Sequence, residues 1–152
     1  MSHTVDIARL DALTAGELYA ILKLRVDVFV VEQDCPYPEL DGKDADALHL
    51  RLFIEGQLAA YARLFPAADG PARIGRVVVA SDFRGRRLGE TLMREAMTAC
   101  EKLSPEADIA ISAQAHLARF YSSLGFVITS DEYLEDGIPH VDMVRAREVA
   151  AE

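Results

Sequence analysis

Apolar and polar residues follow a helical rhythm at the start of the chain. The apolar positions recur at roughly helical intervals at Leu18, Ile21, Leu22 and Phe29. Thr14 and Glu17 stand just before them with the spacing of a capping box, in which each residue satisfies a backbone amide of the other. The pattern therefore predicts a first helix over residues 15–29.

The segment after this helix predicts a loop and then three strands. Residues 34–46, DCPYPELDGKDAD, contain two prolines and an Asp-Gly pair and predict a loop. The runs LHLRLFI (48–54) and LAAYARL (58–64) flank a short EGQ turn, which favours a β-hairpin. After a break at PAADGPA, the run RIGRVVVA (73–80) predicts a short buried strand.

The second half of the chain alternates between helices and strands. Apolar residues trace one face of a helix after Arg87, at Leu88, Leu92, Ala96, Ala99 and Leu103. Pro105 ends that helix, and DIAISAQ (108–114) predicts the next strand. A compact amphipathic helix follows, with apolar positions at Leu117, Phe120, Tyr121 and Leu124. Gly125 suits the left-handed position after its last turn.

Two final strands, FVITSDEYL (126–134) and IPHVDMVRA (138–146), surround an EDG turn. The predicted order is helix, three strands, helix, strand, helix and two strands. This order predicts an α/β (α+β) fold with a mixed sheet, in a single domain over residues 1–152.

The amino-acid composition indicates what class of protein this is. Hydrophobic residues make up 51% and charged residues 27% of the 152 residues, as in an ordinary globular protein. No apolar run reaches the ~20 residues of a membrane span, and residues 1–10 lack the pattern of a signal peptide. We therefore expect a cytoplasmic protein without a membrane partner. Cys35 and Cys100 suit reduced thiols, and the four histidines show no spacing typical of a metal site.

A basic, glycine-containing run interrupts this acidic chain. The formal net charge of −9 disfavours nucleic-acid binding, which needs cations to displace counterions from phosphates. Yet DFRGRRLGETLM (82–93) holds three arginines and two glycines between residues 84 and 89. The run stands between a strand and a helix, where open amides and the helix dipole favour anions. From these residues alone, a phosphate-binding loop and a solvated helix start remain equal alternatives.

Two motifs resemble the GNAT superfamily of N-acetyltransferases. Arg-Gly-x-x-Leu-Gly (84–89) is similar to that family's acetyl-CoA pyrophosphate loop, Gln/Arg-x-x-Gly-x-Gly/Ala, although Arg87 stands where glycine is usual. QAHLARFYSSLGF (114–126) resembles the family's second motif, with Gln114 in place of asparagine. The run LKLRVDVFVVEQDCPYPELDG (22–42) looks like the ElaA-like subfamily.

The resemblance implies a fold and a reaction. The fold would be a mixed central sheet, splayed between its fourth and fifth strands and flanked by helices. The reaction would move an acetyl group from acetyl-CoA to a primary amine by direct attack in a ternary complex, without a metal. The implied cofactor-binding residues are Val77, Val78, Val79, Arg84, Gly85, Arg86, Arg87, Leu88, Gly89, Glu90, Gln114, Leu117 and Phe120.

Tyr121 is the implied proton donor to the sulfur of the leaving CoA. Its ordinary pKa of ~10 lies above the ~8.5 of a cysteine-like thiol, so full transfer is uphill by roughly 2 kcal/mol. The hydroxyl would therefore stabilise the thiolate by hydrogen bonding. The alternative is a core residue, because Tyr121 also lies on the apolar face of its predicted helix.

The acceptor amine would need a base, because freeing the lone pair of a lysine-like amine at pH 7 costs about 4.6 kcal/mol. Glu32, His49 and His140 are the candidates. Glu32 leads, because it closes the first helix, where the resemblance places the acceptor cleft. Its alternative role is to bind nearby backbone amides. Glu32, Gln33 and His49 are the implied substrate residues.

An acidic run lies beside this expected cleft, at Glu32, Asp34, Glu39, Asp41, Asp44 and Asp46. Because acidic clefts concentrate cations, one hypothesis is a cationic acceptor, either a small molecule or a peptide amine. The other is a solvated loop of turn-forming residues. A rival function is a non-catalytic CoA-binding module whose partner surface is this loop. Oligomeric state stays open, a homodimer through the C-terminal strands being one arrangement.

Overall fold

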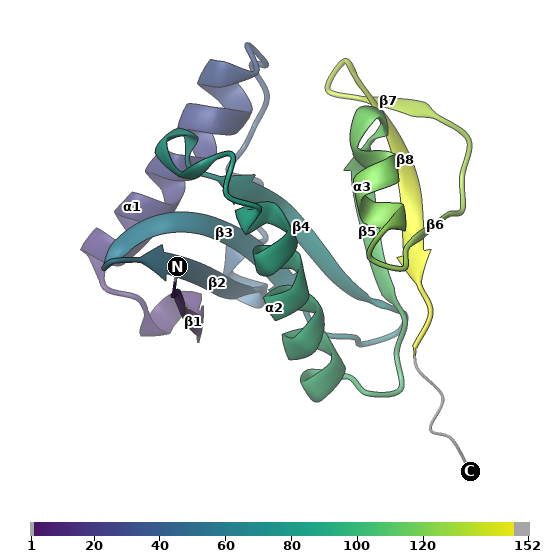
Figure 1. The fold of residues 1–152 in the computed structure, drawn as a ribbon, viewed down its shortest axis with the longest axis horizontal. Helices are drawn as coiled ribbons and strands as arrows, with labels where there is room; N and C mark the ends of the chain where they lie inside the picture. Colours follow the sequence, from purple (N-terminus) through teal and green to yellow (C-terminus); the bar gives the residue numbers. More distant parts are fainter. Residues whose placement is uncertain (1, 148–152) are drawn as a thin grey trace.

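The computed structural model describes residues 2–147, which form a mixed sheet with helices on both faces (Figure 1). The strand order is β1-β2-β3-β4-β5-β8-β6, with β7 pairing on β8. The strands are Thr4–Arg9 (β1), Leu48–Ile54 (β2), Gln57–Phe65 (β3), Ala72–Val79 (β4), Ile109–Gln114 (β5), Val127–Ile128 (β6), Tyr133–Glu135 (β7) and Ile138–Arg145 (β8). The helices are Ala15–Val26 (α1), Leu88–Leu103 (α2) and Ala118–Ser122 (α3). Shorter helical segments are Leu10–Ala12 (η1), Asp27–Glu32 (η2), Asp44–Asp46 (η3), Ser81–Phe83 (η4) and Ala115–Leu117 (η5).

The main core lies between the sheet and α2. In β3, Ala60, Ala62 and Leu64 are fully buried in the cluster that includes the apolar face of α2. The alternate residue Tyr61 packs with Ile21 of α1 and with Val78 in a second cluster. Because successive side chains of a strand point to opposite faces, α1 and α2 cover opposite faces of the sheet (Figure 1).

The first helix begins as predicted and ends differently. Thr14 and Glu17 form both halves of the capping box. The α-helix ends at Val26, and the chain continues through the π-helical segment η2 to Glu32. The wider turn appears in the bonds from the amides of Gln33 and Cys35, each to a carbonyl five residues earlier. Such π turns are frequent at functional sites. Residues of this one, Val28, Phe29 and Glu32, lie beside the opening between β4 and β5.

The sheet splays between β4 and β5, as the resemblance predicts. These parallel strands pair only at Ala72↔Ile109 and Arg73↔Ala110 and then diverge (Figure 1). A bulge lies just past the last pair, where two residues of β4, Arg76 and Val77, face Ala62 alone in β3. Arg76, within this bulge, has a left-handed φ of 51°. Bulges bend the strand that contains them, so this one contributes to the divergence.

Two predictions of secondary structure were wrong. The N-terminal strand β1 was missed, because its half-exposed position on the outer edge of β2 gives only weak apolar alternation. The run 126–134 is not one strand but the two short strands β6 and β7, both pairing with β8. Gly125 takes the left-handed conformation that was predicted, with a φ of 98°.

Candidate active site

A cleft of about 1530 Å³ lies where β4 and β5 diverge. Most of the residues predicted to bind ligand line it: Glu32, Gln33, Val77, Val78, Val79, Arg84, Gly85, Arg87, Leu88, Gly89, Gln114, Leu117 and Tyr121. Four others are not among its lining residues: His49, Arg86, Glu90 and Phe120. The divergence of two strands thus brings together residues that are up to about ninety positions apart.

The N-terminus of α2 borders one end of the cleft. Arg87 is its N-cap residue, with a φ of 58°, and its side chain makes no capping hydrogen bond. Gly85 has a φ of 81°, a conformation that favours glycine. A Cβ added to Gly89 would make only an ordinary contact of 3.8 Å with Phe120 Cζ. Gly89 lines the cleft and carries no side chain to cover its backbone there.

Arg84 lines the cleft and links the end of β4 to the segment after α1. Its Nε and Nη2 each donate to the carbonyl of Val79 at 3.2 Å. Its Nη1 donates to the Glu32 carboxylate at 2.7 Å. The predicted base and a predicted anion-binding residue are therefore paired with each other. Val79 was itself predicted to bind the cofactor, and its carbonyl accepts from Arg84 in this structure.

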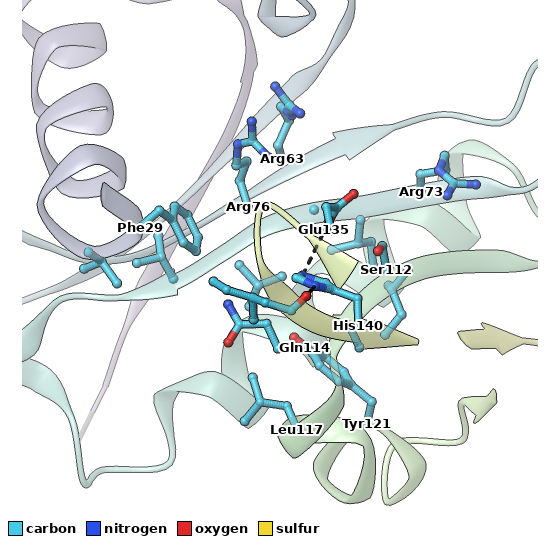
Figure 2. A pocket seen from close by; sticks show the side chains of 18 of the residues that line it. Phe29, Arg63, Arg73, Arg76, Ser112, Gln114, Leu117, Tyr121, Glu135 and His140 are labelled. Carbon is cyan, nitrogen blue, oxygen red and sulfur yellow. Dashed lines mark hydrogen bonds and ion pairs between the residues drawn. The ribbon is translucent and has the colours of Figure 1, made fainter. Parts of the chain in front are cut away.

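Tyr121 reaches the cleft from α3 (Figure 2). It is only 7% exposed and packs edge-on against Phe120 and Phe126. Burial raises the pKa of its hydroxyl to about 12. Within residues 2–147 the hydroxyl has no hydrogen-bond partner. Its ring thus belongs to the core, while its hydroxyl remains available to a ligand.

Gln114 joins the two sides of the sheet opening. Its Nε2 donates to Oε1 of Gln33 at 3.4 Å, from β5 to the segment that follows η2. On its own side, Gln114 lies directly opposite His140 in the antiparallel β5–β8 pair. The side chains of Gln114, His140 and Tyr121 all line the cleft (Figure 2).

His140, the last of the three predicted base candidates, belongs to a polar cluster. The other members of the cluster, Glu135, Tyr133 and Asp142, were not predicted to be site residues. Nδ1 of His140 lies 2.7 Å from the Ile138 carbonyl, and its Nε2 lies 3.4 Å from Oε2 of Glu135. Its ring stacks on Tyr133, whose hydroxyl donates to Asp142 at 2.6 Å. The EDG turn could have predicted the register of this cluster. A two-residue turn places Glu135 opposite Ile138, and the same register places Tyr133 opposite His140.

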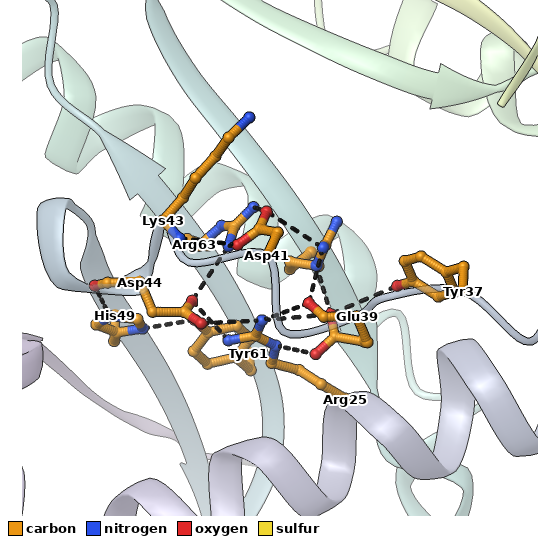
Figure 3. A network of polar contacts seen from close by, with 10 residues as sticks. Arg25, Tyr37, Glu39, Asp41, Lys43, Asp44, His49, Tyr61 and Arg63 are labelled. Carbon is orange, nitrogen blue, oxygen red and sulfur yellow. Dashed lines mark hydrogen bonds and ion pairs between the residues drawn. The ribbon is translucent and has the colours of Figure 1, made fainter. Parts of the chain in front are cut away.

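The acidic run is not an open acidic cleft, and it is not a solvated loop. Its three central carboxylates, Glu39, Asp41 and Asp44, bind three arginines from α1, β3 and β4 (Figure 3). Arg25 is fully buried and contacts Glu39 at 2.9 Å and Asp44 at 2.8 Å. Because these charges are compensated, the run gives no support to a cationic acceptor.

The other two arginines complete this network. Arg63 binds Asp41 through two hydrogen bonds of 2.8 Å, which lower the pKa of Asp41 well below its usual range. Arg76 binds Glu39 and stacks over the Tyr37 ring at 5.5 Å. These contacts offset the cost of a left-handed arginine in β4, and they tie the loop to the bulge.

His49 lies inside this network and not in the cleft, which corrects its prediction as a substrate residue. It is fully buried, with Nε2 2.9 Å from the Asp44 carbonyl and Nδ1 2.6 Å from the Tyr61 hydroxyl. A carbonyl can only accept, so Nε2 carries the proton and Nδ1 accepts from Tyr61. Burial lowers the pKa of this ring. His49 therefore acts as a neutral structural residue.

Residues 22–146 match the acetyltransferase (GNAT) domain family. The chain belongs to the GNAT family. It is 43% identical to protein ElaA of Escherichia coli over 137 residues, which cover 88% of this chain and 90% of ElaA. The crystal structure of that ElaA superimposes with a TM-score of 0.88, at 39% identity, over 95% of this chain and 99% of the other.

Two further GNAT structures are similar. An acyl-CoA N-acyltransferase from Pseudomonas aeruginosa has a TM-score of 0.90 and 47% identity, over 95% of this chain and all of that one. A GNAT family acetyltransferase from Elizabethkingia anophelis with acetyl-CoA bound shares the fold, with a TM-score of 0.66 and 16% identity over 93% and 94% of the two chains. The family match and the likeness to ElaA place this chain among GNAT proteins of the ElaA-like group.

Residues 2–147 contain neither a membrane-spanning helix nor a cluster of metal-ligating side chains. No helix in that range is long and apolar enough to cross a membrane. No group of three or more histidine, cysteine, aspartate or glutamate side chains there is arranged to hold a metal ion.

Proposed function

We propose that this GNAT protein transfers the acetyl group of acetyl-CoA to a primary amine by direct attack, with both substrates bound together. One observation carries the proposal: the uncapped N-terminus of α2, the diverging edge of β4 and the Tyr121 hydroxyl all border one cleft. Residues 1–152 are proposed to act as a single domain.

The α2 end of the cleft fits a pyrophosphate. The first amides of a helix lack intrahelical partners, and here the N-cap side chain does not satisfy them. Arg84 and Arg87 would add charge-assisted contacts, and Arg86 and Glu90 would contribute their backbone amides. Arg84 would exchange part of its contact with Glu32 for the phosphates.

The β4 edge fits an extended arm. Beyond Arg73, the side of β4 that faces β5 has no strand partner among residues 2–147. Backbone groups at Val77 and Val79 would pair with the pantetheine chain, much as an added strand pairs with a sheet edge, and Val78 between them would line the same site. Gln114 and Leu117 would line the opposite side. Phe120 would support this wall by packing under Gly89.

The Tyr121 hydroxyl would face the reacting thioester. Acetyl-CoA supplies an activated acyl group on a thiol leaving group. With a pKa of about 12, Tyr121 lies some 3.5 units above an ordinary thiol, so donating its proton outright would cost about 5 kcal/mol. Tyr121 is therefore proposed to stabilise the sulfur through a hydrogen bond while keeping its proton.

The acceptor would approach from the face that carries α1 and the loop after it. Glu32 and Gln33 line the cleft there and are proposed to contact the acceptor. Glu32 is already paired with Arg84, which favours a role in holding the cleft mouth over a role as the free base. The acceptor is proposed to be a small-molecule or peptide amine.

Thioester consumption tests the proposal. The protein would be incubated with acetyl-CoA and hydroxylamine, a small reactive amine, and the loss of the thioester absorbance followed with time. The proposal predicts catalysed loss that falls strongly in Tyr121→Phe. A protein that binds acetyl-CoA but accelerates this reaction in neither form would instead be a CoA-binding module.

A further inference from the structure

We propose that His140 is the catalytic base for the acceptor amine, and that Glu135 holds the incoming ammonium group beside it. This inference rests on the proposed acetyl transfer and adds the residue that activates the nucleophile. It assigns to His140 and Glu135 the task that the sequence analysis gave first to Glu32.

The hydrogen bond at Nδ1 fixes the tautomer of His140. Nδ1 lies 2.7 Å from the Ile138 carbonyl, and a carbonyl oxygen can only accept. The neutral ring therefore carries its proton on Nδ1 and leaves the lone pair of Nε2 free. This is the arrangement of a general base, in which one nitrogen is anchored so that the other can take a proton.

The free lone pair faces a carboxylate. Nε2 is 3.4 Å from Oε2 of Glu135, so two hydrogen-bond acceptors point at each other when the ring is neutral. A donor between them removes this conflict, and it can be a proton on Nε2 or an ammonium group from outside. The pair is thus built to bind an ammonium and then to keep one of its protons as a histidinium–carboxylate ion pair.

Both residues reach the cleft, and only one is open to water. The side chain of His140 is 11% exposed, whereas that of Glu135 is 53% exposed. Both line the cleft, and Figure 2 shows their side chains joined by a dashed line. Glu135 can therefore meet the ammonium at the entrance, while His140 meets it inside.

The register places His140 next to the reacting centre. It lies opposite Gln114 in the β5–β8 pair, and Gln114 is proposed to border the pantetheine arm. The titratable groups around the ring are Glu135 and Tyr133 from β7, Asp136 from the following turn and Asp142 on its own strand. Asp142 accepts from Tyr133, which leaves Glu135 as the carboxylate in contact with Nε2.

The proton balance is complete with these residues. The ammonium gives one proton to Nε2 of His140 and becomes a neutral amine. The amine then forms the C–N bond as the C–S bond breaks, and its second proton ends on the CoA sulfur beside Tyr121. His140 returns its proton to water through the exposed side of Glu135, which resets the base.

The experiment compares two nucleophiles that differ in their need for a base. Butylamine is almost fully protonated near neutral pH, whereas hydroxylamine is not. Thioester consumption would be measured across pH for the wild type, His140→Gln, Glu135→Gln, Glu32→Gln and the control His3→Gln. His3 pairs with Glu95 on the surface and does not line the cleft. Calorimetric binding of acetyl-CoA checks that each variant keeps its cofactor site.

We expect His140→Gln to lower kcat/KM for butylamine by about 100-fold or more, the usual size of general-base catalysis. With hydroxylamine the loss should stay below about tenfold. Glu135→Gln should raise KM for butylamine more than it lowers kcat. A wild type that consumes hydroxylamine but not butylamine, or a His140→Gln protein that loses both nucleophiles equally while binding acetyl-CoA, overturns the inference and leaves the proposed function standing.

If no amine is consumed, the result counts against the proposed function. Nitrogen NMR of the histidine rings then tests the role of His140 separately. The His140 signals, assigned by their loss in His140→Gln, should show the Nδ1–H tautomer in the neutral ring. The Nε2 signal should move when butylammonium is added to the wild type, and less in Glu135→Gln. An Nε2–H tautomer, or no response to butylammonium, would contradict the inference.

Discussion

The Arg84 guanidinium and the Glu32 carboxylate form an ion pair at the cleft, with Nη1 2.7 Å from Oε2. Arg84 follows β4, and Glu32 ends the π-helical segment after α1. Both side chains are roughly half exposed. A cofactor phosphate and Glu32 would therefore compete for one cation, which links acetyl-CoA binding to the position of the acceptor-side wall.

Glu32→Gln tests that link. Because the substitution releases Arg84 from an opposing charge, acetyl-CoA affinity should stay the same or rise by up to about fivefold, the range of an exposed ion pair. Calorimetry gives the affinity, and steady-state kinetics with butylamine and hydroxylamine give the activity. Should Glu32→Gln lose butylamine turnover and keep hydroxylamine turnover, Glu32 rather than His140 would be the base.

Tyr121→Phe should remove a hydrogen bond to the leaving sulfur without disturbing the core, because the ring is held by Phe120 and Phe126. A hydrogen bond to a charged group contributes about 1.5–3 kcal/mol, so kcat should fall by about 10- to 150-fold. Acetyl-CoA affinity should change little. Since burial raises the pKa of Tyr121 to about 12, ionisation of this hydroxyl should not limit the rate in the neutral range. An unchanged kcat would remove Tyr121 from the reaction.

Arg25→Met should destabilise the protein strongly. Arg25 is fully buried, and Glu39, which is 3% exposed, would lose one of its two cations. Breaking a buried pair on one side costs about 3–5 kcal/mol, measured by urea unfolding. The control Arg94→Met breaks an exposed pair with Glu90 and should cost no more than about 0.5 kcal/mol. Equal losses in the two variants would refute a structural role for the buried network.

His49 should make stability depend on pH. Burial lowers the pKa of His49 below its ordinary ~6.5. As the pH falls below that value, the unfolded chain therefore binds a proton at this residue more readily than the folded chain does. The stability of the folded state is therefore complete above about pH 6.5 and is lost as the pH falls below it. The thermal midpoint should drop less between about pH 7.5 and about pH 5 in His49→Gln than in the wild type. Parallel pH profiles would show that His49 does not carry this effect.

The residues around α2 could be predicted from the sequence because their signals are local. Gly85 and Arg87 stand a few positions from each other, and the strand and helix around them are set by short-range periodicity. The same holds for Tyr121, Leu124 and Gly125, which share one helix and its end. The left-handed φ of Arg87 also explains why glycine is usual at that position.

The loop network could not be predicted because its partners are distant in sequence. Arg25, Arg63 and Arg76 lie on three elements that meet only in the folded sheet, so no spacing links them to Glu39 or Asp41. The sequence therefore offered only an acidic cleft or a solvated loop as roles for these carboxylates. The partnership of His140 with Glu135 depends on the β7–β8 register, which the sequence suggested but which the predicted single strand over 126–134 obscured.

Calorimetric titration of acetyl-CoA tests the central claim most directly, that the loop before α2 holds the cofactor. The wild type should bind with micromolar affinity. Arg87→Glu and Gly89→Glu should each weaken binding by at least about tenfold, because each places a carboxylate where the phosphates are proposed to lie. Lys102→Glu makes the same charge change as Arg87→Glu, but in the last turn of α2, and should bind like the wild type. If the wild type does not bind acetyl-CoA, or if Lys102→Glu weakens binding as much as Arg87→Glu, the loop is not the cofactor site.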